Sequence, residues 1–233
     1  MGEHTQKRII RKLDLELFLS QIAPHPSPQA HLEQYTISAQ VAATMLYIAA
    51  YTNNDIIGKT VLDLGCGTGR LALGASFLGA RAIVAIDLDK LAVERALESS
   101  KRVGLTHSVQ WVTGDIEAVS GRFNTVLQNP PFGVQVRRAD RVFLTKALES
   151  GKKVYSLHNH PSTDERLVRQ LKASGGFMQV DPSPFLAQFA SKHNGAVKAV
   201  YATLMTIPKM FDFHTKIKHD FIVDLYVFEV LNS

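Results

Sequence analysis

The chain has 233 residues, a length typical of a single domain that can bury a full core. Hydrophobic residues make up 45% and charged residues 20%, which is ordinary globular usage. The longest apolar run, 41–51, is too short to span a bilayer, and no secretory signal opens the chain, so we expect no membrane segment and a cytoplasmic location. The single cysteine, Cys66, excludes an internal disulfide and a cysteine-rich metal site. A net charge of +5 favours a polyanionic partner, although many basic proteins bind no nucleic acid.

The first predicted element is an amphipathic helix over 5–20, an extension that precedes the core. Ile9, Leu13 and Leu17 share one face, and basic residues lie largely on the other. That basic face is either ordinary solvated surface or a contact for phosphates. A second helix is predicted over 38–51, just after the string Leu32-Glu33-Gln34-Tyr35-Thr36.

A glycine-dense turn, Gly65-Cys66-Gly67-Thr68-Gly69, follows the short apolar strand predicted at 61–64. Alternate glycines let backbone come close to a ligand. Arg70 stands where the nicotinamide-binding fingerprint has its last small residue, which weakens a dinucleotide interpretation.

From Val61 the pattern alternates strands (61–64, 82–86, 109–112, 125–127) with helices (71–78, 90–101). Such repetition predicts a parallel sheet whose carboxyl edge binds ligands, which gathers Asp63, Asp87, Asp115 and Asn129 along one edge. If the ligand contains a nucleoside, Asp87 is placed to accept hydrogen bonds from its two ribose hydroxyls, and Asp115 to accept one from its adenine amine. Helix capping is the plain alternative for each aspartate.

The stretch Asn129-Pro130-Pro131-Phe132 comes directly after the last of these strands. The two prolines restrict the backbone, so that Asn129 is held at the strand end. The Asn129 side-chain oxygen and the Pro130 carbonyl are acceptors, and Phe132 adds an aromatic face. This set suits an exocyclic amine on a flat ring, because two acceptors on its hydrogens localise and aim the nitrogen lone pair. The alternative is a proline-rich turn.

Basic residues follow this stretch in two places. Arg137, Arg138 and Arg141 stand in the next loop, where they either meet phosphates or form a solvated surface paired with Asp140. Helices at 140–149, 163–173 and 185–193 and a strand at 153–158 are predicted next, with no readable role for 161–184. The strands at 197–207 and 221–230 are expected to pair antiparallel. Their connection carries basic and aromatic residues that suit unstacked bases or, alternatively, pack on the core; the basic candidates are Lys209, His214 and Lys216.

The chain resembles the S-adenosylmethionine-dependent methyltransferases, because it combines a strand-end acid, a glycine turn and a downstream Asn-Pro-Pro-Phe stretch. The strings Leu32-Glu33-Gln34-Tyr35 and Tyr155-Ser156-Leu157-His158 are similar to the methyltransferase-like five type, which modifies an adenine of small-subunit ribosomal RNA in archaea and eukaryotes. That family usually continues its first string with one residue, often Pro, and then Thr. Here Thr36 follows directly, so its hydroxyl stands one place early.

The pattern and the resemblance together imply an α/β fold with a Rossmann-like, seven-stranded, mostly parallel sheet, helices on both faces and an antiparallel C-terminal strand pair. One domain is expected, with an extension (1–31) and a catalytic core (32–233). The resemblance implies S-adenosyl-L-methionine as cofactor, with Asp63 at its amino-acid end. The expected cofactor-binding residues are Gln34, Thr36, Asp63, Gly65, Cys66, Gly67, Gly69, Asp87, Leu88, Asp115, Ile116 and Asn129.

The reaction implied is attack by the N6 amine of an RNA adenine on the cofactor methyl, with the base flipped out onto Phe132. Asn129, Pro130, Pro131 and Phe132 are the expected catalytic residues. The resemblance also implies a small zinc-binding activator subunit beside the strand at 109–112. Guanine N2 and a protein glutamine are alternative acceptors, and a cofactor-binding RNA subunit without turnover is an alternative of another class.

Overall fold

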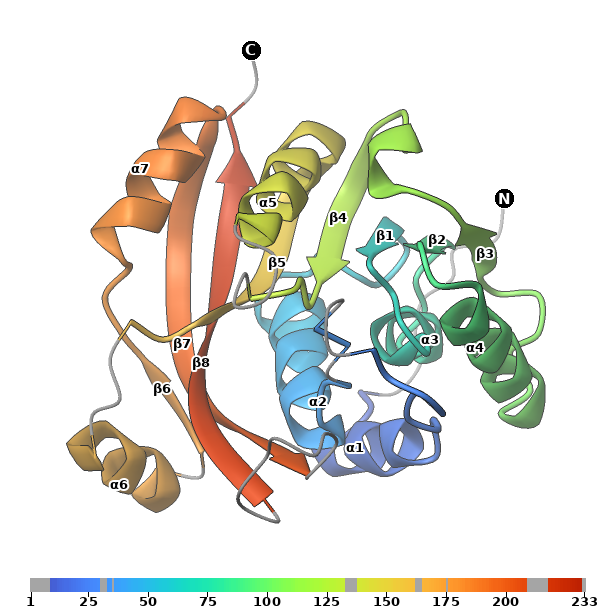
Figure 1. Ribbon diagram of the computed structural model, residues 1–233, viewed down its shortest axis with the longest axis horizontal. Helices are drawn as coiled ribbons and strands as arrows, with labels where there is room; N and C mark the ends of the chain where they lie inside the picture. Colours follow the sequence, from blue (N-terminus) through green and yellow to red (C-terminus); the bar gives the residue numbers. More distant parts are fainter. Residues whose placement is uncertain are drawn as a thin grey trace.

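The computed structural model describes residues 9–29, 33–34, 36–132, 138–161, 165–174, 176–208 and 218–231. Within these residues, helices cover both faces of an eight-stranded sheet with the order β3-β2-β1-β4-β5-β8-β7-β6 (Figure 1). The strands are β1 (Thr60–Leu64), β2 (Ala82–Asp87), β3 (Gln110–Thr113), β4 (Phe123–Gln128), β5 (Gly151–Asn159), β6 (Phe177–Gln179), β7 (Gly195–Pro208) and β8 (Lys218–Val230). The α-helices are α1 (Lys12–Ser20), α2 (Ala39–Tyr47), α3 (Arg70–Phe77), α4 (Lys90–Arg102), α5 (Ala139–Ser150), α6 (Glu165–Ala173) and α7 (Pro184–Lys192).

Strands β3, β2, β1, β4 and β5 run parallel, and β8 pairs antiparallel with both β5 and β7. The predicted fold class and the antiparallel C-terminal pair are therefore confirmed. In register, Leu64 of β1 lies opposite Ile86 of β2 on one side and Gln128 of β4 on the other. The chain thus leaves these three neighbouring strands at the same level of the sheet.

The sheet has one strand more than the seven expected. The stretch 161–184, which had no readable role, contains α6 and the short strand β6, and β6 pairs antiparallel with β7. Three residues are too few to show the alternation that marks a strand in sequence.

The sheet separates two apolar cores. One core lies between the sheet and α1, α2 and α3, and the other lies under α5 and α7 (Figure 1). The regular part of α2 ends earlier than predicted and continues as a π-helical turn, Ile48–Thr52. No helix in the described part of the chain is long and apolar enough to cross a membrane.

Helix α1 packs into the core, although the sequence pattern assigns it to an extension that precedes the core. It begins at Lys12, later than predicted, because the preceding residue has an extended backbone. Its buried face includes Leu15 and Phe18, and the Phe18 ring stacks on Phe77 of α3 with centroids 4.1 Å apart. The apolar face that the sequence predicted is instead exposed to solvent; its residues are Ile9, Leu13 and Leu17.

Candidate functional site

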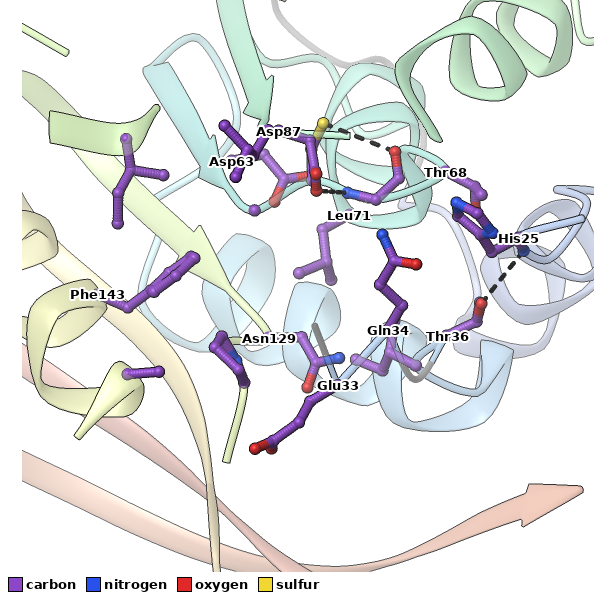
Figure 2. Close-up of a pocket in the computed structure, with 18 of the residues that line it drawn as sticks. His25, Glu33, Gln34, Thr36, Asp63, Thr68, Leu71, Asp87, Asn129 and Phe143 are labelled. Atoms are coloured by element: carbon purple, nitrogen blue, oxygen red, sulfur yellow. Dashed lines mark hydrogen bonds between the residues drawn. The ribbon is translucent and has the colours of Figure 1, made fainter. Parts of the chain in front are cut away.

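A cavity of about 390 Å³ lies where the parallel strands end (Figure 2). Its walls come from the segment 25–37, the glycine turn, the ends of β2 and β3, the end of β4 and the start of α5. A volume of this size accommodates a small organic ligand. The predicted site residues that line it are Gln34, Thr36, Asp63, Gly65, Cys66, Gly67, Asp87, Leu88, Asp115, Ile116, Asn129 and Pro131.

The glycine turn forms one wall of the cavity and leads into α3. A Cβ at Gly67 would meet no heavy atom within 4 Å, so this residue leaves open space on the ligand side. Gly69 has φ +82°, and a Cβ there would lie 2.4 Å from the Trp111 ring, so glycine is required both by conformation and by packing. Gly69 therefore shapes the turn without lining the cavity. Burial raises the pKa of the Cys66 thiol, which agrees with its interpretation as a small residue in a tight turn.

Asp63 lies at the base of the turn and is almost completely buried. Its Oδ2 accepts from the Ala72 backbone N–H at 2.9 Å, whereas Oδ1 is buried without a hydrogen-bond partner among the described residues. Burial is the main cause that raises the pKa of Asp63 to about 7, and the nearby carboxylate of Asp87 contributes to this rise. A buried carboxylate with spare acceptor capacity in a cavity wall is suited to a cationic ligand group.

Asp87 ends β2, and its two carboxylate oxygens are fixed by backbone donors. Oδ2 accepts from Gly67 N at 2.7 Å, and Oδ1 accepts from Asp89 N at 2.9 Å. Helix capping is performed by Asp89, whose Oδ1 accepts from Leu91 N at 2.8 Å. Because a carboxylate has about four acceptor positions, Asp87 keeps capacity for two ligand hydroxyls. Burial raises the Asp87 pKa against the effect of its two backbone donors.

Asp115 follows β3 and also lines the cavity. Its Oδ1 accepts from Glu117 N at 2.8 Å and caps a short 3₁₀ turn, Ile116–Ala118. Both functions discussed for this residue, cap and cavity acceptor, are therefore compatible, since its second oxygen is not used by the cap. Next to it, Ile116 is buried, whereas Leu88 after β2 is exposed.

Asn129 directly follows β4, and its side chain points into the cavity (Figure 2). Pro131 also lines this cavity. Pro130 is buried and does not line the cavity. Phe132 is half-buried outside the cavity lining, and its ring meets Phe221 of β8 in a T-shaped contact with centroids 6.0 Å apart. Asn129 and Pro131 of the motif thus share one chamber with the three strand-end aspartates.

The motif search missed residues of the cavity wall that come from distant parts of the chain. His25 and Glu33 line the cavity, and Glu33 has a left-handed backbone with φ +50°. Arg70 also lines it and donates to the backbone carbonyls of Ile22, at 2.7 Å, and Ile37. Two partial signals were present in the sequence: Glu33 stands in the string Leu32-Glu33-Gln34-Tyr35, and Arg70 takes the place of a small residue at the end of the glycine turn.

Of the predicted RNA-binding residues, Arg138 is described. It precedes α5 with φ +73° and is exposed. Arg141 lies over the Phe185 ring of α7, 4.7 Å from its centroid. The remaining candidates lie outside the described residues: Arg137, Lys209, His214 and Lys216.

Comparison with known proteins identifies this constellation. The sequence model of the "Methyltransferase small domain" family matches residues 40–156, which contain the glycine turn, the strand-end aspartates and Asn129. The chain belongs to this family.

Similar proteins cover nearly the whole methyltransferase chain. It is 36% identical over 220 residues to the uncharacterized protein MJ0284 of Methanocaldococcus jannaschii, across 89% of each chain. It is 33% identical to a Drosophila melanogaster protein named rRNA N(6)-adenosine-methyltransferase Mettl5, across 93% of this chain and 95% of that one. The crystal structure of PH1948 from Pyrococcus horikoshii, described as a candidate RNA methyltransferase, superposes with a TM-score of 0.80 at 33% identity, across 97% and 100% of the two chains.

As a member of this family, the protein is an S-adenosylmethionine-dependent methyltransferase, and the cavity fits that cofactor. The buried Asp63 with its open Oδ1 suits the ammonium group, the bare face of Gly67 gives room beside it, and Asp87 offers acceptors for ribose hydroxyls. In the described residues, no group of three or more His, Cys, Asp or Glu is arranged to hold a metal ion.

Proposed function

We propose that this methyltransferase acts on the N6 amine of an adenine in ribosomal RNA. The observation that carries the proposal is that Asn129 and Pro131 line the same cavity as Asp63 and Asp87. An acceptor for a planar amine and acceptors suited to the cofactor therefore face one chamber. The name of the Drosophila relative, which matches over nearly its whole length, supports adenine N6 as the acceptor.

The proposed role of Asn129 is to make a poor nucleophile reactive. The lone pair of an adenine amine is delocalised into the ring, and hydrogen bonds from the amine to the Asn129 side-chain oxygen and the Pro130 carbonyl localise it. S-adenosylmethionine supplies an electrophilic methyl group when bound. The amine loses one proton after it gains the methyl, and solvent can accept that proton, since the Asn-Pro-Pro-Phe stretch contains no His, Lys or acid.

The target base is proposed to stack on Phe132 after it flips out. The ring is half-buried and follows Asn129 by three residues, outside the cavity lining. Arg138 is exposed at the start of α5, where it can contact phosphates near the flipped base. Arg137, Lys209, His214 and Lys216 remain candidates for further phosphate contacts.

Two further parts of the proposal concern partners and location. Strand β3 is at the edge of the described sheet, and most of its side chains are exposed. An edge strand can extend its sheet into a second protein, so β3 is the proposed docking strand for a small zinc-binding activator subunit. The cytoplasm, where ribosomal RNA and ribosomes are accessible, is the proposed location.

The test supplies labelled S-adenosylmethionine with ribosomal subunits in one reaction and with protein extract in another. Mass spectrometry then identifies the methylated nucleoside or residue. N6-methyladenosine in ribosomal RNA supports the proposal. N2-methylguanosine or methylglutamine assigns another acceptor, and cofactor binding without any methylated product indicates a subunit without turnover.

A further inference from the structure

The segment between α1 and α2 lies against the cofactor cavity although it precedes the part of the chain that the family model matches. Two sets of hydrogen bonds attach this segment to the rest of the fold. Arg70 holds the carbonyls of Ile22 and Ile37, and Asp89 holds the side chains of His25 and Gln34. The second set includes the buried His25, which has no role in the proposed chemistry.

The hydrogen bonds of His25 determine which ring nitrogen carries the proton. The Ser27 backbone N–H donates to His25 Nδ1 at 3.1 Å, so Nδ1 is an acceptor. The proton of the neutral ring is therefore on Nε2, which lies 2.9 Å from Asp89 Oδ2 and donates to it. The side chains of this pair are only 4% and 9% exposed, so the bond is protected from water.

Asp89 connects His25 to the predicted cofactor contacts. Its Oδ2 also accepts from Gln34 Nε2 at 2.6 Å, and its Oδ1 caps α4 through Leu91 N. Its own backbone N–H donates to Asp87 Oδ1 at 2.9 Å. Burial alone raises the pKa of Asp89, but the donors around it, Gln34 first, more than offset burial and lower that pKa overall. The ionised carboxylate is thus held in one position by donors from two parts of the chain, the segment between α1 and α2 and the start of α4.

We propose that His25 is a positioning residue of the cofactor site, which acts through Asp89 to hold Gln34 and the ribose acceptor Asp87 in place. His25 lies 64 positions before Asp89 in the chain. Together with Gln34, it joins the segment between α1 and α2 to a network formed by the glycine turn and the start of α4. The inference rests on cofactor binding in this cavity. It is independent of which amine receives the methyl group.

The main test measures binding of S-adenosylhomocysteine by calorimetry, together with kcat and KM for S-adenosylmethionine. His25→Ala should weaken binding and raise KM about tenfold, the size expected when a hydrogen bond to a charged group is lost, with a much smaller change in kcat. His25→Gln should restore most of the affinity, because the Gln amide nitrogen can occupy the place of Nε2. The exposed His107→Ala is the matched control and should behave as the parent protein.

A double-mutant cycle tests whether His25 acts through Asp89. Asp89→Asn keeps an oxygen to cap α4 but faces His25 and Gln34 with donors. The double variant should bind no more weakly than Asp89→Asn alone. If the losses of S-adenosylhomocysteine affinity in the two single variants add up in the double variant, His25 does not act through Asp89. If His25→Ala binds S-adenosylhomocysteine as tightly as His107→Ala, His25 only stabilises the fold. If His25→Ala does not fold, His25→Phe keeps the ring without the donor, and equal affinity of the Phe and Gln variants would refute the inference.

Discussion

The side-chain amide of Gln128 donates to the hydroxyl of Ser156 across the β4–β5 pair, with a nitrogen–oxygen distance of 2.8 Å. The same hydroxyl lies 2.8 Å from Nε2 of His158, and all three side chains are buried. Gln128 directly precedes Asn129, so a buried polar network fixes the strand end that carries the proposed acceptor of the target amine. Gln128 and Ser156 are also partners in the register of the β4–β5 pair, so the side-chain hydrogen bond joins two residues that lie opposite each other in the sheet.

Ser156→Ala should therefore affect both stability and turnover. The loss leaves the Gln128 amide buried without its acceptor, which costs roughly 1–3 kcal/mol of unfolding free energy. Because Asn129 follows directly, kcat at saturating cofactor should also fall, while cofactor affinity stays near that of the parent. Urea denaturation and steady-state kinetics measure the two effects, with the exposed Ser120→Ala as control. A stability loss with unchanged kcat would remove the proposed influence on Asn129.

Asp63 and His158 should give opposite pH dependences of stability. Burial raises the Asp63 pKa to about 7, so its stabilising contribution is complete only below its ordinary pKa and is lost as pH rises from there through 7. Burial lowers the His158 pKa to about 4, so its contribution is complete above its ordinary pKa and is lost as pH falls toward 4. The two effects offset each other in the parent protein between these values.

Single variants should separate these two effects. Relative to the parent, Asp63→Asn should gain stability as pH rises from 4 to about 6.5, the ordinary histidine pKa, because the opposing effect of Asp63 is removed while that of His158 remains. His158→Gln should become less stable as pH rises over the same range, because Asp63 remains. Melting temperatures across this range measure both slopes, with His107→Gln as control. Curves parallel to that of the parent would contradict the assignment.

Asn129→Ala should abolish turnover and leave cofactor affinity nearly unchanged. The removed oxygen acts on the target amine, whereas the strand-end aspartates provide the acceptors for the cofactor. Product formation with ribosomal subunits and calorimetry with S-adenosylhomocysteine measure the two quantities. Full activity of this variant would exclude Asn129 as the acceptor.

Asp87→Ala should show the opposite pattern, with cofactor binding weakened by roughly 1–3 kcal/mol as the ribose hydroxyls lose a charged partner. The Gly67 N–H also loses its acceptor, so the glycine turn becomes less ordered. Calorimetry measures the affinity, and the exposed Asp181→Ala provides a control of equal charge change. Unchanged affinity would leave Asp87 with a structural role only.

The sequence predicted the parts of the protein that depend on local pattern. Asp63, Asp87 and Asn129 each end a buried strand, and parallel strands bring such ends to one edge, so their shared cavity could be expected from spacing. The contacts of His25 and Arg70 could not, because they join residues tens of positions apart and depend on the path of the chain between them.

Helix α1 shows a different limit of sequence analysis. Apolar residues at Ile9, Leu13 and Leu17 fit one helical face, but Leu15 and Phe18 fit another, and periodicity does not choose between two apolar faces. Packing against α2 and α3 decides which face is buried. The extra strand β6 escaped prediction for a related reason, since its identity as a strand comes from pairing with β7.

The indole of Trp111 packs against Gly69 at the end of the glycine turn. The chain contains a single tryptophan, so its fluorescence comes from one known position. The emission of the unmodified protein therefore reports on the turn that faces the cofactor. Titration of cofactor can be followed optically without any label, and a spectrum that shifts on binding distinguishes movement of this turn from events elsewhere in the fold.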